Sequence, residues 1–116
     1  MIRSSWVFVL RAQANTGAER HPNSHQRMMS YRGSGDFQLW TGGRWRSNPL
    51  VSDSEAPIES RWVSIPPNIW HQGVVPTENW VVLSFHTVPE GELIEERPDT
   101  TDTELTHQRR YLDKQK

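Results

Sequence analysis

Cysteine is absent from the 116 residues, which excludes disulfides, thiolate metal sites and a cysteine nucleophile. Long hydrophobic runs are absent too: no segment approaches the roughly 18–20 apolar residues of a membrane span. The apolar stretch over residues 6–10 is too short for a signal peptide. The net charge of −1 gives no attraction to nucleic acid or to an anionic membrane. We therefore expect a single cytoplasmic domain that binds neither.

Charge and apolar residues are unevenly distributed along the chain. Residues 90–116 carry 8 acidic and 5 basic side chains, whereas the 8 basic residues before them are all arginine. From residue 95 onward only Leu105, Tyr111 and Leu112 are apolar, so we expect this segment to bury little surface. The sequence thus predicts a folded domain over residues 1–90 and a charged tail over 91–116. The tail is expected to be extended, helical over 103–112, or partly disordered unless it docks on a partner chain.

Short runs rich in Val, Phe, Trp and Ile dominate the first 88 residues, and Gly, Pro, Asn and Ser separate them. Thr41-Gly42-Gly43 predicts a tight turn, because glycine adopts positive φ angles easily. Residues 47–57 are polar and are interpreted as a loop. No convincing period of 3.6 residues precedes position 89, which favours an all-β closed barrel or sandwich. The predicted strands cover residues 6–10, 28–31, 36–40, 44–46, 61–65 and 80–88.

One group of polar residues has a spacing that brings side chains together. Glu19 and His21 are two residues apart, so on a strand they project to the same face. Residues 22–25 predict a turn, after which Gln26 and Met28 share one face of the returning strand. In a small closed barrel, side chains on the concave face converge, and His71 would then approach Glu19 and His21.

The same segment resembles the first signature motif of the cupin superfamily. That motif has the form H-x-H, three or four residues, Glu, six residues, Gly. Here the frame contains Glu19, His21, Gln26 and Gly33 at matching spacings. Two positions depart from the motif, because Glu19 replaces a histidine and Gln26 replaces the glutamate.

A second segment resembles the other cupin motif, P-x-G-x-x-H. Here it contains Pro66, Asn68 and His71, with Asn68 replacing the glycine. The resemblance covers roughly residues 6–90. It implies a small, single-domain cupin barrel of the RmlC-like jelly-roll type, which generally forms homodimers.

The resemblance also implies a divalent metal ion. Carried over position by position, its ligands would be Glu19, His21, Gln26 and His71. Two imidazoles and a carboxylate suit Fe, Zn, Mn or Ni, whereas the amide oxygen of Gln26 is a weaker ligand. Because two ligand types are replaced, a protein that binds no metal stays a second interpretation.

Further residues are predicted to surround this site. His86 shares a strand face with Val82 and Ser84, opposite the more core-like Val81, Leu83 and Phe85. His86 is therefore a candidate pocket residue, either a proton shuttle or a hydrogen-bond donor. Glu19, if it is not a ligand, and His86 are the candidate catalytic bases. The candidate substrate-binding residues are Met28, Trp40, Trp62 and Arg27.

Two functions follow from these expectations. The first is a metal-dependent enzyme that acts on a small organic substrate with a carbonyl or carboxylate group, by dioxygenase, isomerase, lyase or cyclase chemistry. The second is a non-catalytic sensor that binds a small molecule in a degraded metal site. In both cases we expect a homodimer that uses residues 6–10 and the last strand of the barrel, since an open sheet edge invites pairing.

Overall fold

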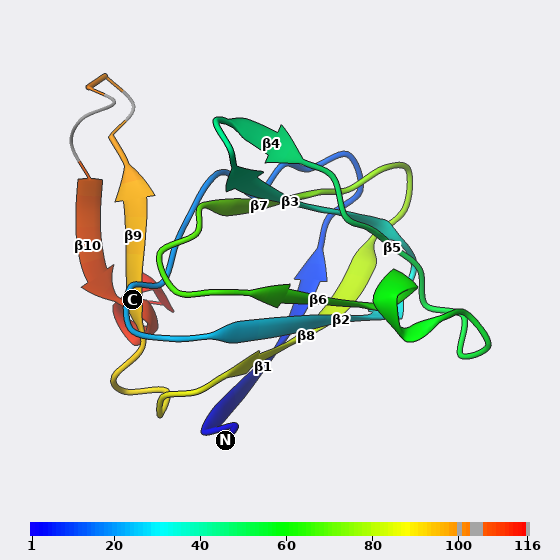
Figure 1. Cartoon of the computed structure of the whole chain (residues 1–116), viewed down its shortest axis with the longest axis horizontal. Coiled ribbons are helices and arrows are strands. Elements are labelled where there is room, and N and C mark those ends of the chain that lie inside the picture. Colours follow the sequence, from blue (N-terminus) through cyan, green and yellow to red (C-terminus); the bar gives the residue numbers. More distant parts are fainter. Residues whose placement is uncertain (100, 103–105, 116) are drawn as a thin grey trace.

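The computed structural model describes residues 1–99, 101–102 and 106–115. Two antiparallel sheets face each other, and a two-stranded hairpin stands at one end of them (Figure 1). The first sheet has the order β1 (Ser4–Leu10), β8 (Trp80–His86), β2 (Gln26–Arg32) and β6 (Trp62–Ile65). In the second sheet β3 (Gly35–Thr41) pairs with β4 (Arg44–Arg46), β5 (Pro49–Leu50) and β7 (His71–Val74). The hairpin consists of β9 (Ile94–Pro98) and β10 (Thr106–Arg110).

Strand β8 shows how the first sheet divides its side chains between the interior and the outside. Its even-numbered residues face inward and are at most 1% exposed, including Ser84 and His86. Its odd-numbered residues, Val81, Leu83 and Phe85, are only half-buried on the outer face. The expectation that this odd-numbered set forms the core was therefore wrong. His86 faces inward because it lines a cavity, and Ser84 hydrogen-bonds to His86 and Gln26, which a binary hydrophobic pattern does not reveal.

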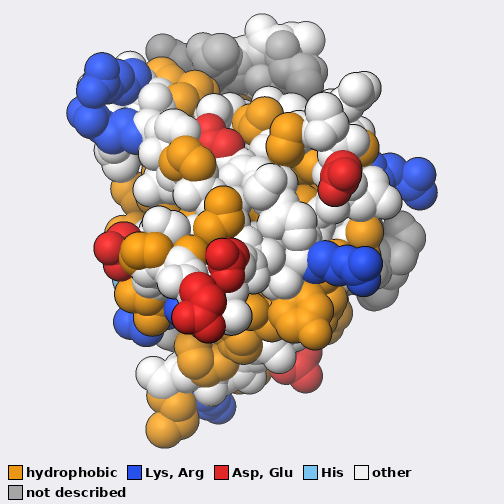
Figure 2. Space-filling view, turned by 90° about the vertical axis from the view of Figure 1, so that its right-hand side faces the viewer, with side chains coloured by type: hydrophobic (Ala, Val, Ile, Leu, Met, Phe, Trp, Pro, Cys, Tyr) orange, Lys and Arg blue, Asp and Glu red, His pale blue; other side chains and the backbone are white. Residues whose placement is uncertain are grey.

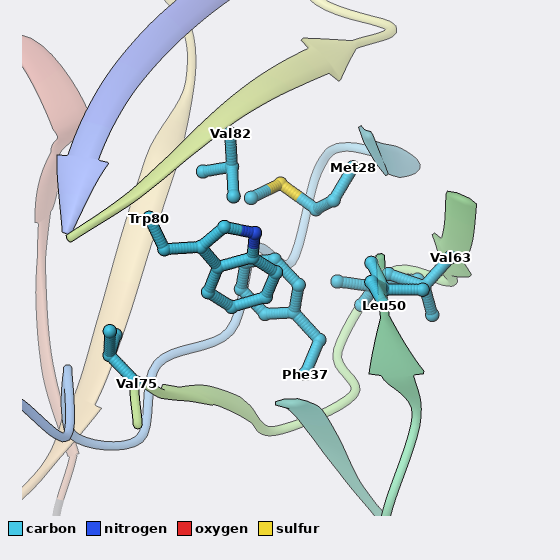
Figure 3. Close-up of a cluster of buried hydrophobic side chains, with 8 residues drawn as sticks. Met28, Phe37, Leu50, Val63, Val75, Trp80 and Val82 are labelled. Atoms are coloured by element: carbon cyan, nitrogen blue, oxygen red, sulfur yellow. The ribbon is translucent and has the colours of Figure 1, made fainter. Parts of the chain in front are cut away.

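The hydrophobic core fills one half of the space between the sheets. The Trp80 and Phe37 rings pack with centroids 4.8 Å apart (Figure 3). A Cβ atom at Gly35 would lie 2.2 Å from the Trp80 ring, so this close packing requires glycine there. The buried core residues are Met28, Phe37, Leu50, Val63, Ile65, Val75, Trp80 and Val82.

All six predicted strands are present, with ends that differ by at most two residues. Two further strands of the sheets were missed. β5 has only two residues inside a polar segment, and β7 reads His-Gln-Gly-Val, which carries little apolar signal. Both pair with β3, so tertiary pairing and not local propensity defines them.

The C-terminal segment is more ordered than its composition predicts. Over its described part, the helix expected at 103–112 is the strand β10, followed by the 3-10 helix η2 (Tyr111–Gln115); residues 103–105 lie outside the described residues. Among the described residues from 95 onward, Glu95 and Tyr111 are buried, each at most 3% exposed, whereas all of β10 is exposed, in agreement with the expectation that this segment buries little. The hairpin pairs with the barrel through a bridge between Arg20 and Glu96.

The barrel end opposite the hairpin has a mixed surface. Figure 2 shows acidic, basic and hydrophobic side chains intermingled there, without a field of one charge sign. A second 3-10 helix, η1 (Ile58–Ser60), lies in the segment before β6. No helix within the described part of the chain is long and apolar enough to cross a membrane.

Candidate functional site

A cavity of about 380 Å³ lies between the hydrophobic core and the hairpin. Its apolar lining residues include Phe8, Leu10, Met28, Phe37 and Val82. Its polar lining residues are Thr16, Glu19, His21, Gln26, His71, His86, Arg97 and Tyr111. A cavity with both apolar surface and several polar groups suits a small amphipathic ligand.

Three of these polar residues form a compact cluster. One carboxylate oxygen of Glu19 and one ring nitrogen each of His21 and His71 all lie within 4.8 Å of one another. Glu19 Oε1 is 3.5 Å from His71 Nε2 and 3.8 Å from His21 Nε2. The backbones of Glu19 and His71 exchange two hydrogen bonds, of 3.0 and 2.9 Å, which fix their relative position. The two motifs, fifty residues apart in sequence, therefore meet as predicted.

Hydrogen bonds define which nitrogen of each imidazole faces the cluster. His21 Nδ1 donates to the Ile94 carbonyl at 2.8 Å, and His71 Nδ1 donates to the Ile69 carbonyl at 3.0 Å. Because a carbonyl only accepts, both Nδ1 atoms carry the proton in the neutral rings and both Nε2 atoms present lone pairs. His71 Nε2 is buried and makes no hydrogen bond within the described part of the chain. This donor set fits a divalent metal ion, so the cluster could hold one.

Asn68 connects the second motif to the first. Its backbone has φ of 64°, a conformation that glycine adopts most easily and that asparagine tolerates better than most residues. Its backbone N–H donates to the backbone carbonyl of His21 at 3.1 Å. The exchange of glycine for asparagine in this motif thus keeps the turn that positions His71 beside His21.

Gln26 also faces the cavity and is 4% exposed. Its amide nitrogen donates to Ser84 Oγ at 2.8 Å and to Met28 Sδ at 2.9 Å. Its carbonyl oxygen, Oε1, is buried without a hydrogen bond within the described part of the chain. The amide is therefore held with its acceptor oxygen available. A place for Gln26 in the ligand set stays a prediction.

His86 packs edge-on against His21, with ring centroids 4.9 Å apart. Both of its nitrogens are engaged by serine hydroxyls, Ser24 Oγ at 3.0 Å and Ser84 Oγ at 3.2 Å. Burial first, and then the neighbouring His21, lower the pKa of His86 to about 3. The imidazole is thus neutral at physiological pH, which favours a hydrogen-bonding role over a proton shuttle.

The other predicted residues divide between the cavity and the surface. Met28 lines the cavity, whereas Arg27, its neighbour on β2, is exposed on the outer face. Trp62 stacks on Phe85 on that same outer face, with centroids 5.7 Å apart. Trp40 is 41% exposed. Arg27, Trp40 and Trp62 therefore lie outside the cavity lining that contains His71, contrary to the expectation that they bind the substrate there. Side chains of a strand alternate between its two faces.

Three functional candidates were missed, and all belong to the C-terminal segment. Arg97 and Tyr111 line the cavity, and Glu95 contacts Arg97. The Tyr111 ring lies edge-on to Trp6, with centroids 4.9 Å apart, and is 5.9 Å from the His21 ring. Burial raises the pKa of the Tyr111 phenol, which is thus protonated at neutral pH. Local sequence gave no signal for these residues, since their neighbours are polar and the pairing partner is remote.

No protein-family model matches the chain, and no curated protein matches it. Solved structures do. A dTDP sugar isomerase from Desulfovibrio desulfuricans is 18% identical, with a TM-score of 0.69 over 84% of this chain and 65% of that one. The TDP-quinovose 3,4-ketoisomerase WlaRB from Campylobacter jejuni is 18% identical, with a TM-score of 0.62 over 75% of this chain and 63% of that one.

A coconut protein also has a similar fold. The coconut allergen cocosin is 16% identical, with a TM-score of 0.69 over 83% of this chain and 24% of that one. The chain thus spans about two thirds or less of these proteins. At such identities the likeness concerns the fold, which is the cupin jelly-roll barrel that the two motifs predicted.

Proposed function

We propose that this chain binds a divalent metal ion between Glu19, His21 and His71, and acts on a small organic substrate that carries a carbonyl or carboxylate group. The observation that carries the proposal is the convergence of two imidazole lone pairs and a carboxylate oxygen within 4.8 Å at a cavity wall. Fe, Zn, Mn and Ni all suit two imidazoles and a carboxylate.

The metal would supply Lewis-acid polarisation of a substrate oxygen, or activation of water or O₂. The protein's own residues define the rest of the site. Phe8, Phe37 and Val82 give the cavity apolar surface beside its polar groups. Gln26 offers its buried amide oxygen to a hydroxyl or amine of the ligand. Dioxygenase, isomerase, lyase and cyclase chemistry all start from such a site.

The cavity favours a small substrate over a sugar nucleotide, the kind of substrate named for the two isomerases. Its volume is about 380 Å³, at the small end of the range for ligand pockets. Among the described lining residues, Arg97 alone has a permanent positive charge, and its guanidinium contacts Glu19 and Glu95. A diphosphate group would find little charge complementarity there.

Metal binding tests the proposal directly. We expect protein purified without added metal to contain near-stoichiometric Fe, Zn, Mn or Ni by elemental analysis. His71→Asn should weaken Zn²⁺ binding by at least about 100-fold, because a direct ligand matters no less than the groups that orient it. His25→Asn is the matched control, since His25 bonds to Ser64 Oγ at 2.8 Å and lies outside the cavity lining. Equal Zn²⁺ affinity in the two variants would refute the metal site.

A non-catalytic sensor is the second candidate, and the state of His86 favours it. That imidazole is neutral and bonded to two serines, and Gln26 is an amide, so neither supplies a base near neutral pH. A chelated sample that still binds small carboxylates or carbonyl compounds, measured by thermal shift, supports the sensor. Binding or turnover that is lost on chelation and restored by metal supports the metal-dependent function.

We also propose that the protein is a cytoplasmic homodimer. Strand β1 ends the first sheet, and β8 is its strand partner within the described part of the chain. Val7 and Val9 on its outer face are 68% and 63% exposed. A second copy that packs on this strand would cover both the open edge and these valines.

A further inference from the structure

The C-terminal hairpin contains a buried carboxylate between two guanidinium groups. The Glu95 side chain is 1% exposed. Its Oε1 accepts from Arg97 Nε at 3.0 Å, and its Oε2 accepts from Arg109 Nε at 2.9 Å. A carboxylate this deeply buried is stable only when its charge is compensated, and both oxygens meet a cation here. Arg109 thus anchors Glu95 from β10, and Glu95 in turn orients Arg97 from β9.

Arg97 uses nearly all of its donors within the protein. Besides Glu95, its NH2 nitrogen donates to Glu19 Oε2 at 3.2 Å. Its NH1 nitrogen contacts the Thr16 and Ala18 carbonyls at 3.3 and 3.5 Å. A guanidinium has five N–H groups, and four of them have partners here. Arg97 is therefore built into the wall of the cavity and is poorly placed to serve as the receptor for a substrate anion.

These contacts give the two carboxylate oxygens of Glu19 different neighbours. Oε2 is held by Arg97, at the hairpin. Oε1 faces the cavity, 3.5 Å from His71 Nε2 and 3.8 Å from His21 Nε2. A carboxylate fixed in this way offers a single oxygen toward the imidazoles, and its rotation about the terminal torsion is restrained. Groups that orient a metal ligand typically change metal affinity by about 10–100-fold when they are removed.

We propose that Glu95 and Arg97 form a clamp that holds Glu19 with one oxygen toward His21 and His71, and so act as positioning residues for the metal site. This inference rests on the proposed function. It assigns a role to a segment that lies outside both sequence motifs. It also explains why Glu19 occupies a position where the motif has histidine. The second carboxylate oxygen of Glu19 accepts a hydrogen bond from Arg97, and a histidine that bound the metal could not accept this bond.

The test compares two arginines that tie the same chain segment to the same hairpin. Arg97→Met removes the bond to Glu19. Arg20→Met is the matched control, because Arg20 bonds to Glu96 at 2.7 Å and stacks on Trp70 at 4.3 Å, away from the cavity lining. We expect the Kd for Co²⁺, followed by its visible absorption, to rise about 10–100-fold in Arg97→Met. In Arg20→Met it should stay within about twofold of the wild type.

Glu95→Gln is a second variant that keeps the side chain's shape and weakens its hold on Arg97. It should raise the Kd for Co²⁺ in the same direction, and circular dichroism should show that all three variants are folded. An unchanged Kd in folded Arg97→Met would overturn the clamp. An equal loss in Arg20→Met would also overturn it, because docking of the hairpin alone would then control affinity.

Crystal structures of the metal-free wild type and Arg97→Met test the clamp without any metal. We expect Glu19 Oε1 to face both imidazoles in the wild type and to turn away in the variant. An unmoved Glu19 refutes the clamp. If the wild type binds no Co²⁺, the proposed function fails, and these two structures still decide whether Arg97 orients Glu19.

Discussion

Individual side chains give this cavity its chemical character. Two histidines present lone pairs because backbone carbonyls bind their other nitrogens, and Glu19 adds a carboxylate oxygen beside them. A third histidine, His86, lies next to His21 but is buried between two serine hydroxyls. The three imidazoles lie close together but therefore differ in their hydrogen-bond partners.

The lowered pKa of His86 makes stability depend on pH. The unfolded chain binds a proton at this residue below about pH 6.5, whereas the folded protein binds it only near pH 3. The full contribution is thus present above pH 6.5 and is lost as the pH falls toward 3. At pH 4.5 the loss amounts to about 3 kcal/mol.

Chemical denaturation of chelated protein at pH 7 and 4.5 measures this effect. Wild type should lose about 3 kcal/mol more of its free energy of unfolding than His86→Gln does over the same interval. The comparison removes the contributions that other titrating groups share in both proteins. Identical losses in the two proteins would contradict the assignment of a neutral, buried His86.

The packing of β3 against β8 determines how the elements fit. Trp80 on β8 is fully buried and lies over Gly35, the first residue of β3. Its indole nitrogen donates to Ser30 Oγ on β2 at 2.8 Å, so one side chain connects three strands. The core therefore depends on a glycine at this crossing.

Gly35→Ala should destabilise the protein by about 1–3 kcal/mol, because the new methyl group would overlap the Trp80 ring. Gly91→Ala is the control, since a Cβ there meets nothing within 4 Å. The control should stay within about 1 kcal/mol of wild type. Denaturation midpoints followed by circular dichroism compare the two. Equal stability of both variants would show that Trp80 does not pack on Gly35 as described.

At the scale of the whole molecule, the barrel has the C-terminal hairpin at one end (Figure 1) and, within the described residues, an unpaired sheet edge at strand β1. In the hairpin, Arg97 contacts Glu19, and Tyr111, which follows the hairpin, packs against Trp6; both residues line the cavity. The outer face of β1 leaves Val7 and Val9 exposed at a sheet edge. Exposed edge strands with apolar side chains tend to pair, which is the physical basis for the proposed homodimer. The division of the chain at residue 90 stays a prediction.

The double variant Val7→Glu, Val9→Glu should convert the proposed dimer to a monomer of 13.5 kDa, because two charges per chain would be buried at the proposed interface. Val51→Glu, at another position that is 39% exposed, should leave the dimer intact. Sedimentation at micromolar concentration measures both. A wild type that sediments as a 13.5 kDa species under these conditions would contradict the dimer.

The sequence alone determined the all-β class and six of the strands, because alternation and turn residues act locally. The meeting of His21 with His71 was predicted from the resemblance to two cupin motifs and from the closure of a small barrel, not from a local pattern. The tertiary structure decided which face of β8 is the interior, where Arg27 and Trp62 lie, and that the C-terminal segment completes the site. These features depend on contacts such as Arg97 with Glu19, 78 residues apart in the chain. No local sequence pattern encodes a partner at that separation in the chain. The contact forms only when the barrel has closed and the hairpin has docked on it.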